Sequence, residues 1–331
     1  MLKNTWIQTL SAAVAIGALC AVPTLDRAVA ADSSAPTAGT SPALELEKVR
    51  FVFQKQKDPA SLKDAAETLG SALSDQLGVP VEVIVPGNYS ASVQALVSGT
   101  TDVAYVSSLP FLLARRDGGA ELILAEQRDD AQGVTRTEYD SLMVVPADSP
   151  LQTLDDLKAQ ASDTRFCFTS PTSTSGMVFA HLRLVREGIL AKGQDPAEVF
   201  SEVSFGGGYA QALREVVAGR ADVAAVSFYT MEGPKADVYL SPEERSQLRI
   251  LARTPGVPTH VVCVRGGLDE ATKATIRQAL LAVAEANPDL LSDVYGTARF
   301  IEVDEDAHVA PAVEAVEAVG LPLDDLNKKK K

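Results

Sequence analysis

The expected fold rests on two matching stretches: Tyr89–Val106 reads YSASVQALVSGTTDVAYV, and Tyr209–Val226, 120 residues further on, reads YAQALREVVAGRADVAAV. Each stretch predicts a helix that begins at a tyrosine, ends at a glycine and leads into an Asp-Val-Ala strand. A serine follows each strand, Ser107 in the first copy and Ser227 in the second. Any helix–strand unit can share the glycine and the apolar strand, but the matched tyrosines and serines go further. The pattern therefore predicts two similar α/β lobes that face each other across a cleft.

Strand-like and helix-like segments alternate around these two stretches. An amphipathic helix ending at Gly78 follows a strand over Arg50–Gln54, and similar alternation runs on to about Leu251. Such alternation is typical of βαβ units and parallel sheets. The fold class expected is α/β, with two lobes that are each a mostly parallel sheet flanked by helices. Ligands of such sheets bind beyond the carboxyl ends of the strands, where Ser107, Ser108 and Ser227 would lie.

The composition excludes several classes of protein. The chain has 331 residues, of which 46% are hydrophobic and 22% charged, so wholesale disorder is not expected. A formal net charge of −14 argues against a nucleic-acid partner, because nucleic-acid binders present a basic surface. An aromatic content of 5% also disfavours stacking platforms for single-stranded nucleic acid.

The first 30 residues have the pattern of a cleavable signal peptide. Lys3 precedes the uncharged run Leu10–Val22, and Ala28–Ala30 is typical of a cleavage site, so cleavage is expected near Ala30. The uncharged run is shorter than the roughly 20 residues of a membrane-spanning helix. Cys20 suggests lipidation, but the bulky Leu19 before it disfavours that alternative. We expect residues 31–44 to be a disordered lead-in and the mature protein to be periplasmic.

A hydroxyl-rich segment between a predicted strand and a predicted helix is the strongest local signal. It runs from Thr169 to Gly176 and contains Ser173, Thr174 and Ser175 directly before a helix expected over Met177–Arg186. A helix start presents unpaired N–H groups and a partial positive charge, which favour an anion. Ordinary N-capping by one hydroxyl is the simpler alternative. Three successive hydroxyls before a glycine favour ligand binding.

The glycine-rich segment Phe205–Tyr209 has the same order of strand, turn and helix start, and would bring backbone N–H groups close to a ligand.

Signals for catalysis are weak, because no nucleophile elbow, dinucleotide fingerprint or P-loop occurs. We therefore expect no enzymatic activity, no cofactor and no metal. The mature chain would keep Cys167 and Cys263, for which a disulfide and two free buried thiols both remain open. The C-terminal lysines 328–331 are expected to be a solvated tail, whether or not they are native.

The motifs together resemble the extracytoplasmic solute-binding proteins of phosphonate, phosphite and phosphate ABC transporters. The resemblance covers roughly Val49 to Ala286. Its motifs are Asn88-Tyr89, Asp102–Ser108, Tyr139–Ser141 leading into Val145–Pro150, Ser173–Gly176, Phe205–Tyr209 and Thr254–Pro258.

This resemblance implies a type II periplasmic-binding fold that closes on its ligand. Lobe 1 would comprise residues 45–140 and 262–331, and lobe 2 residues 141–261, with chain crossings near Tyr139–Pro146 and Ala252–Val264. The residues expected to bind the ligand, from the strand ends and the resemblance together, are Tyr89, Ser107, Ser108, Tyr139, Ser173, Thr174, Ser175, Tyr209, Tyr229 and Glu232.

Two positions depart from the pattern of aminophosphonate binders in this family. Tyr209 stands where those proteins have a histidine, and Pro255 where they have an aspartate that holds an amine. An amine-bearing ligand is therefore in doubt. Glu232 could meet an amine or accept the proton of a monoprotonated oxyanion; as a solvated loop acid it would do neither.

The resemblance implies a monomer that captures a small tetrahedral phosphorus oxyanion and delivers it to a membrane permease. The sequence does not choose among phosphonate, phosphite and phosphate. A ligand-sensing role feeding a membrane sensor remains an alternative, as does a secreted hydrolase.

Overall fold

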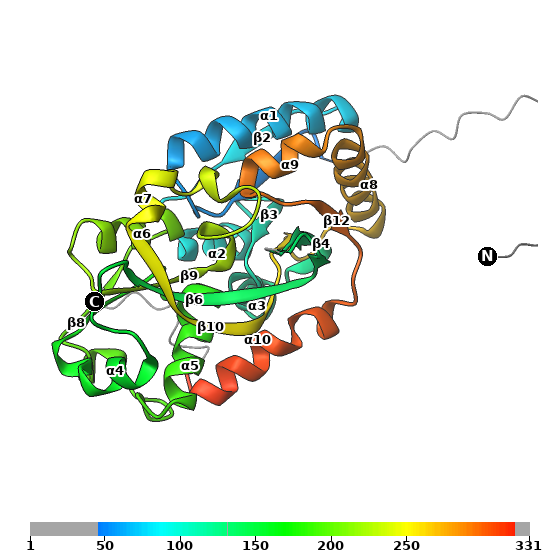
Figure 1. Cartoon of the computed structure of the whole chain (residues 1–331). Coiled ribbons are helices and arrows are strands. Elements are labelled where there is room, and N and C mark those ends of the chain that lie inside the picture. The colour runs from blue at the N-terminus through cyan, green and yellow to red at the C-terminus, as the bar shows by residue number, and fades with distance from the viewer. Residues whose placement is uncertain (1–45, 131, 322–331) are drawn as a thin grey trace, which may run out of the picture. The chain divides into compact units, whose positions relative to one another are not determined.

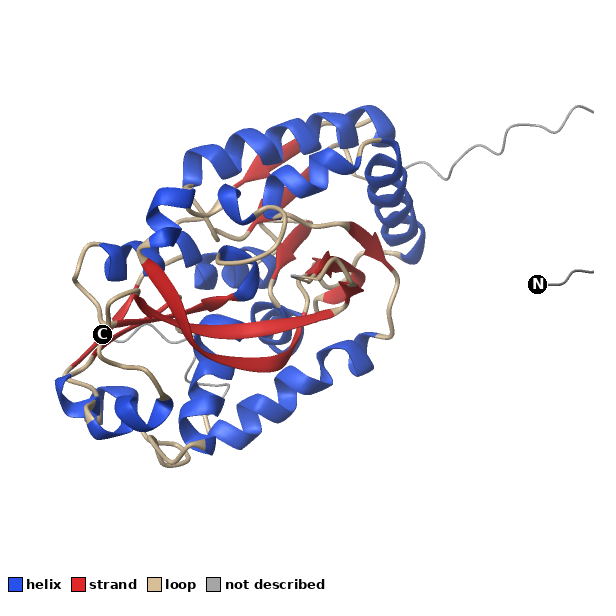
Figure 2. Cartoon of the chain, in the orientation of Figure 1, coloured by secondary structure: helices blue, strands red, loops and turns tan. Residues whose placement is uncertain are grey.

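The computed structural model describes residues 46–130 and 132–321. These residues fold into two β-sheets flanked by helices (Figures 1 and 2). The predicted signal peptide over residues 1–30, the lead-in over 31–44 and the C-terminal lysines lie outside the described residues. All the described residues belong to one unit of the chain. Within them, no helix is both long enough and apolar enough to span a bilayer.

The first sheet carries the N-terminal strands, and we call it with its helices the first lobe. In sheet order its strands are β12 (Arg299–Ile301), β4 (Glu121–Asp129), β11 (Val261–Val264), β3 (Val103–Val106), β1 (Val49–Phe53) and β2 (Val81–Ile84), and β5 (Thr135–Arg136) pairs with β4 alone. Its helices are α1 (Pro59–Leu77), α2 (Tyr89–Val97), α3 (Ser108–Gly118), α8 (Glu270–Ala286) and α9 (Pro288–Tyr295). Helix α1 follows the N-cap Asp58 and ends at Gly78, whose left-handed conformation confirms the predicted glycine end.

The second sheet, with its helices, is the second lobe. In sheet order its strands are β10 (Leu248–Pro258), β6 (Glu138–Pro146), β9 (Val223–Ser227), β7 (Arg165–Phe168) and β8 (Glu202–Phe205). Its longer helical segments are α4 (Leu154–Ala159), the π-helix η2 (Thr174–Phe179), α5 (Ala180–Arg186), α6 (Tyr209–Val217) and α7 (Pro242–Ser246). Its single-turn 3₁₀ segments are η1 (Ala161–Asp163), η3 (Pro196–Glu198), η4 (Phe228–Thr230) and η5 (Ala236–Val238).

The internal repeat seen in the sequence is confirmed by the topology. Strands β1, β2 and β3 are parallel in the order β3-β1-β2, and β7, β8 and β9 are parallel in the order β9-β7-β8. Each repeat also contains the same ion pair at the start of its first strand. Arg50 donates from its backbone N and from Nε to Asp102 Oδ2, both at 3.0 Å, and Arg165 does the same to Asp222 Oδ2 at 2.8 and 3.1 Å.

The prediction of mostly parallel sheets was wrong, because both sheets are mixed. Strands β4, β11 and β12 of the first sheet run antiparallel to their neighbours, as do β6 and β10 of the second. Strands β4, β6, β10 and β11 adjoin the two crossings of the chain. The strand by which the chain approaches the crossings and the strand by which it leaves them run in opposite directions, so β4 is antiparallel to β11 and β6 to β10, whereas the parallel pairs need a helical crossover.

The chain passes between the lobes at two adjacent points. It leaves the first sheet after β5 and enters the second through Thr137, and it returns between β10 and β11 through Thr259 and His260. The backbone N of Thr259 donates to the carbonyl oxygen of Thr137 at 3.0 Å, so the two crossings are bonded to each other. The second crossing lies inside the predicted range. The first lies just before its range, because Tyr139–Pro146 is all within β6.

The C-terminal helix α10 (Glu305–Val319) packs against β10 and α5 of the second lobe and against α3 of the first. A hydrophobic cluster buried between the lobes includes Val93, Leu109, Val178 and Leu213.

The predicted lobe boundaries, 45–140 with 262–331 and 141–261, stay a prediction. Cys167 in β7 and Cys263 in β11 are free and buried, which answers the question of a disulfide.

The buried side chain of His181 in α5 should make the stability of the protein sensitive to acid. This side chain is 0% exposed, neither ring nitrogen finds a hydrogen-bond partner in the described part of the chain, and burial lowers its pKa to about 4. The unfolded chain therefore binds this proton more readily, and stability falls as the pH drops from about 6.5 towards 4. The His181→Leu variant should lose roughly 2 kcal/mol less than the parent between pH 7 and pH 5 in urea unfolding. An identical loss in both proteins would contradict this assignment.

Candidate functional site

Ser107 and Ser108, which follow β3, are both buried, and so is Ser227 at the end of β9. The backbone N of Ser107 donates to Gln54 Oε1 at 3.1 Å. Ser108 directs its hydroxyl to the second crossing, donating to the carbonyl oxygens of Pro258 and Thr259 at 3.3 and 3.2 Å. Ser107 is therefore bonded within the first lobe, whereas Ser108 links the start of α3 to the second crossing, which we also call the hinge.

The three successive hydroxyls of the predicted anion segment have three different partners. The helix begins at Thr174 as the π-helix η2, three residues earlier than expected. Ser173 Oγ accepts from Gly176 N at 3.1 Å and so caps the helix, which is the simpler role considered for it. Thr174 Oγ1 accepts from Leu109 N of the first lobe at 2.8 Å. Ser175 Oγ lies 3.0 Å from Tyr209 Oη and 3.4 Å from Tyr139 Oη.

Four predicted tyrosines gather around Ser175. The ring of Tyr89 meets that of Tyr209 edge-on at 6.5 Å between centres, and Tyr229 lies 5.8 Å from Tyr209 and 5.4 Å from Tyr139. All four side chains are at most 5% exposed. Burial raises the pKa of Tyr89, Tyr139 and Tyr229 well above the ordinary value, so these hydroxyls stay protonated. We call the four tyrosines together with Ser175 the cleft cluster.

Backbone and side-chain hydrogen bonds join the two lobes beside the cleft cluster. The first two N–H groups of helix α6, those of Tyr209 and Ala210, donate to the carbonyl oxygen of Gln56 at 2.9 and 3.3 Å. The hydroxyl of Tyr229 donates to Gln56 Oε1 at 3.2 Å. The segment after β1 is therefore held at the start of α6, and the lobes are in contact.

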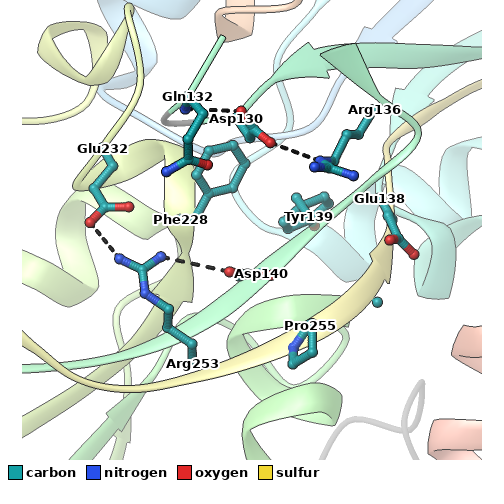
Figure 3. A pocket seen from close by; sticks show the side chains of 11 residues that line it. Asp130, Gln132, Arg136, Glu138, Tyr139, Asp140, Phe228, Glu232, Arg253 and Pro255 are labelled. Carbon is teal, nitrogen blue, oxygen red and sulfur yellow. Dashed lines mark hydrogen bonds and ion pairs between the residues drawn. The ribbon is translucent and has the colours of Figure 1, made fainter. Parts of the chain in front are cut away.

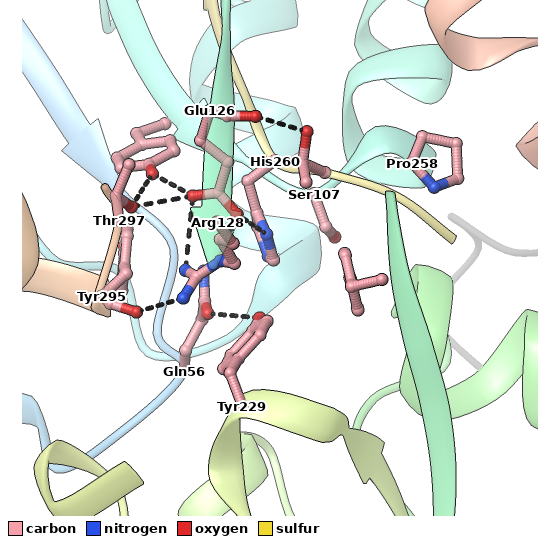
Figure 4. A network of polar contacts seen from close by, with 12 residues as sticks. Gln56, Ser107, Glu126, Arg128, Tyr229, Pro258, His260, Tyr295 and Thr297 are labelled. Carbon is pink, nitrogen blue, oxygen red and sulfur yellow. Dashed lines mark hydrogen bonds and ion pairs between the residues drawn. The ribbon is translucent and has the colours of Figure 1, made fainter. Parts of the chain in front are cut away.

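A buried charged network, which the sequence-based predictions did not include, lies against the cleft cluster (Figure 4). Glu126 accepts hydrogen bonds from Tyr105 Oη, from Thr297 Oγ1 at 2.9 Å and from Arg128 Nε at 2.5 Å. His260 Nδ1 lies 3.1 Å from the same carboxylate. The guanidinium of Arg128 lies 3.7 Å from the ring centre of Tyr229. The network thus supports the cleft cluster from the side of the first lobe.

The protonation states in this network follow from burial and pairing. Burial alone would raise the pKa of the Glu126 carboxyl, but the Arg128 guanidinium beside it lowers that pKa below its ordinary value. The pair is therefore ionised. The sequence carried one signal of it, because Glu126 and Arg128 are charged residues at alternate positions directly after the apolar run Leu122–Ala125, so they share one face of the strand.

Four buried polar atoms in this region have no hydrogen-bond partner within residues 46–130 and 132–321. They are Gln56 Nε2, Tyr89 Oη, Ser227 Oγ and His260 Nε2. Buried polar groups are almost always paired in folded proteins, so several unpaired ones in one region indicate a ligand site. Three of the four can donate a hydrogen bond, which suits an anion. Across the same described ranges, no group of three histidine, cysteine or acidic side chains could hold a metal ion.

Glu232 lies outside the cleft cluster. It lines a pocket of about 540 Å³ beside the hinge, together with Tyr139, Pro255 and Arg253 (Figure 3). Its carboxylate is bonded to the Arg253 guanidinium, which also lies 3.6 Å from Asp140. Tyr139 is the predicted site residue that this pocket shares with the cleft cluster.

This arrangement of two lobes, two crossings and a polar interface between strand ends is that of a type II periplasmic binding protein. The family model for the periplasmic substrate-binding protein of phosphonate ABC transporters matches residues 51–308. The chain belongs to this family.

Three relatives illustrate the likeness. The phosphonates-binding periplasmic protein of Escherichia coli is 26% identical over 62% of this chain and 56% of its own length. The phosphate-import protein PhnD of Mycolicibacterium smegmatis is 27% identical over 53% of each chain. The chain thus matches little more than half the length of these curated relatives. The structure of PhnD1 from Prochlorococcus marinus in complex with methylphosphonate shares the fold, with a TM-score of 0.69 at 20% identity, covering 82% of this chain and 97% of that one.

Proposed function

We propose that this protein binds a small phosphorus oxyanion at the cleft cluster and delivers it to an ABC-transporter permease. The observation that carries the proposal is the group of unpaired buried polar atoms at the interface, namely Gln56 Nε2, Tyr89 Oη and Ser227 Oγ with Ser175 nearby. Neutral donors bind an anion without a permanent ion pair, so the anion can be released again. Arg128 does not supply a free cation, because Glu126 already neutralises it.

Capture would proceed by closure of the lobes. In an open form the oxyanion meets the hydroxyls of the second lobe at Ser175 and Tyr209, and closure then brings Gln56 and Tyr89 against it. Hydroxyl and N–H groups replace the hydration shell of the ligand. The bonds from α6 to Gln56 O hold the closed form, which the permease would recognise. We infer a monomer, exported with cleavage near Ala30 and active in the periplasm.

An amine-bearing phosphonate is the less favoured ligand. The carboxylate that could have met the amine, Glu232, is engaged by Arg253. Proline at position 255 offers no charge in the same pocket. Phosphite, phosphate and a simple alkylphosphonate remain the preferred class. We favour transport over hydrolysis, because Ser175 Oγ has tyrosine hydroxyls for neighbours and no histidine beside it among the contacts of the described residues.

Replacing Ser175 by alanine tests the site. The purified protein, prepared without phosphate, is titrated calorimetrically with phosphate, phosphite, methylphosphonate, aminoethylphosphonate and sulfate. We expect one phosphorus oxyanion to bind, and Ser175→Ala to weaken its binding by about 10- to 100-fold, since the loss leaves a buried ligand oxygen unpaired. At 100 times Kd the ligand should add about 2.7 kcal/mol to the parent's stability.

Ser246→Ala is the matched control, because Ser246 is exposed and its hydroxyl bonds only Glu243 O among the described contacts. This variant should bind as the parent does. Failure of all five ligands would overturn the proposed function. Preference for aminoethylphosphonate would show that Tyr209 and Pro255 do not exclude an amine.

A further inference from the structure

His260 contacts the buried charged network through one of its two ring nitrogens. It lies at the second crossing, its side chain is 0% exposed, and its ring stacks on Tyr139 at 6.0 Å between centres. Nδ1 faces Glu126 at 3.1 Å, whereas Nε2 has no partner in the described part of the chain. In Figure 4 the ring lies between the Glu126–Arg128 pair and Ser107.

The surroundings of His260 decide which nitrogen carries its proton. An ionised Glu126 carboxylate accepts only, so Nδ1 must be the protonated nitrogen. Burial, which outweighs the attraction of Glu126, lowers the pKa of His260 below its ordinary value and keeps the ring neutral. Nε2 is then an acceptor. The titratable and charged groups around the ring or its backbone are Glu126 and Arg128 of β4, Tyr105 of β3, Tyr139 of β6, Tyr229 of η4, Tyr295 of α9 and His308 of α10.

Among the unpaired buried groups, His260 Nε2 can accept a hydrogen bond but cannot donate one, and this makes a chemical demand on the ligand. Gln56 Nε2, Tyr89 Oη and Ser227 Oγ can all donate to oxyanion oxygens. The lone pair of His260 Nε2 instead repels an ionised oxygen and attracts an O–H group. A phosphorus oxyanion near neutral pH can keep one acid proton, because its second ionisation falls close to that range. Sulfate is fully ionised there and has no such proton to donate.

Resting on the proposed function, we propose that His260 Nε2 accepts the acid proton of the bound oxyanion, so that the protein selects singly protonated phosphorus oxyanions and rejects sulfate. No proton leaves the ligand; a hydrogen bond forms from its P–O–H group to the imidazole. Glu126 is a positioning residue in this arrangement, since it fixes the tautomer. This assigns to His260 the acceptor role that the sequence had suggested for Glu232.

The protonation state of the bound ligand is the direct test. The ³¹P chemical shift of methylphosphonate in complex with the parent protein is followed from pH 5.5 to pH 8.5. We expect the bound ligand to keep the shift of its monoanion throughout, while the free ligand changes to the dianion. Calorimetry in two buffers of different ionisation enthalpy should show uptake of one proton per ligand at the high-pH end. A dianion shift for the bound ligand would overturn the inference.

The His260→Asn variant tests the residue itself. Asparagine can still donate to Glu126 but offers no acceptor at the place of Nε2. We expect methylphosphonate binding at pH 6 to weaken about tenfold or more, and the ratio of its affinity to that for sulfate to fall by a similar factor. His181→Asn is the matched control, since it removes a buried imidazole elsewhere in the chain and should leave this ratio unchanged.

The outcomes separate this inference from the proposed function. Parent protein that binds no phosphorus oxyanion contradicts the proposed function. Parent protein that binds one, with His260→Asn folded and equally selective at every pH, contradicts the role of His260 alone. If the variant fails to fold, the ³¹P measurement on the parent still decides the question.

Discussion

Replacing Glu126 by glutamine should lower the free energy of unfolding by about 3–5 kcal/mol, the usual effect of removing one member of a buried ion pair. The carboxylate is 0% exposed and receives bonds from Arg128, Thr297 and Tyr105. Glutamine has nearly the same shape but no charge, so the guanidinium of Arg128 would remain buried without a counter-ion. Urea unfolding at pH 7 measures the difference.

Glu215→Gln is the control for this prediction. Its carboxylate pairs with Arg220, whose side chain is 62% exposed, so the change should alter stability by less than about 1 kcal/mol. Equal effects of the two substitutions would show that the buried pair adds nothing beyond a surface pair. The variant at position 126 should also bind ligand less well, because the tautomer of His260 would no longer be fixed.

Adding one methyl group at Gly206 should destabilise the second lobe by about 2–3 kcal/mol. A Cβ atom there would lie 2.4 Å from the backbone N of Ala212 and 2.6 Å from its Cα, both in the first turn of α6. The backbone of Gly206 is also fixed, because its N donates to Phe168 O at 2.9 Å. The turn therefore has to move away from α6, and Tyr209 at the start of that helix moves with it. Ligand affinity should fall together with the melting temperature.

Gly87→Ala gives the comparison. Gly87 also precedes a helix that begins with a tyrosine, but it is exposed and a Cβ atom would meet nothing within 4 Å. We expect its stability to change by less than about 0.5 kcal/mol. A Gly206→Ala protein with unchanged melting temperature and affinity would show that α6 can shift freely on its sheet.

The features predictable from the sequence were those with a local or repeated signal. The match between Tyr89–Val106 and Tyr209–Val226 indicated two equivalent units, and both have the same strand order. Ser175 and Tyr209 come together from two helix starts that the sequence indicated, and Tyr139, which was expected there from the family resemblance, lies beside Ser175. The expectation that the two lobes close on a ligand came from the family resemblance, because periodicity alone does not indicate it.

The features that could not be predicted depend on contacts between distant segments. Glu126 and His260 are 134 positions apart, and nothing near either residue indicates the other. The pairing of Glu232 with Arg253 depends on how a loop lies beside β10. The sequence also did not show whether the strands near the crossings run parallel or antiparallel to their neighbours, because a strand-like run has the same composition in either direction.

The paired crossings have a mechanical consequence. Thr259 N bonds to Thr137 O, and the β6–β10 ladder continues directly from that point with Glu138 opposite Pro258. Two linked strands form a ribbon that bends easily across its face, whereas shearing one strand along the other would break its ladder. We therefore expect relative motion of the lobes to follow one principal bending direction. In the proposed closure, Gln56 would return to the start of α6 in the same alignment each time, so the site would always reassemble in one geometry.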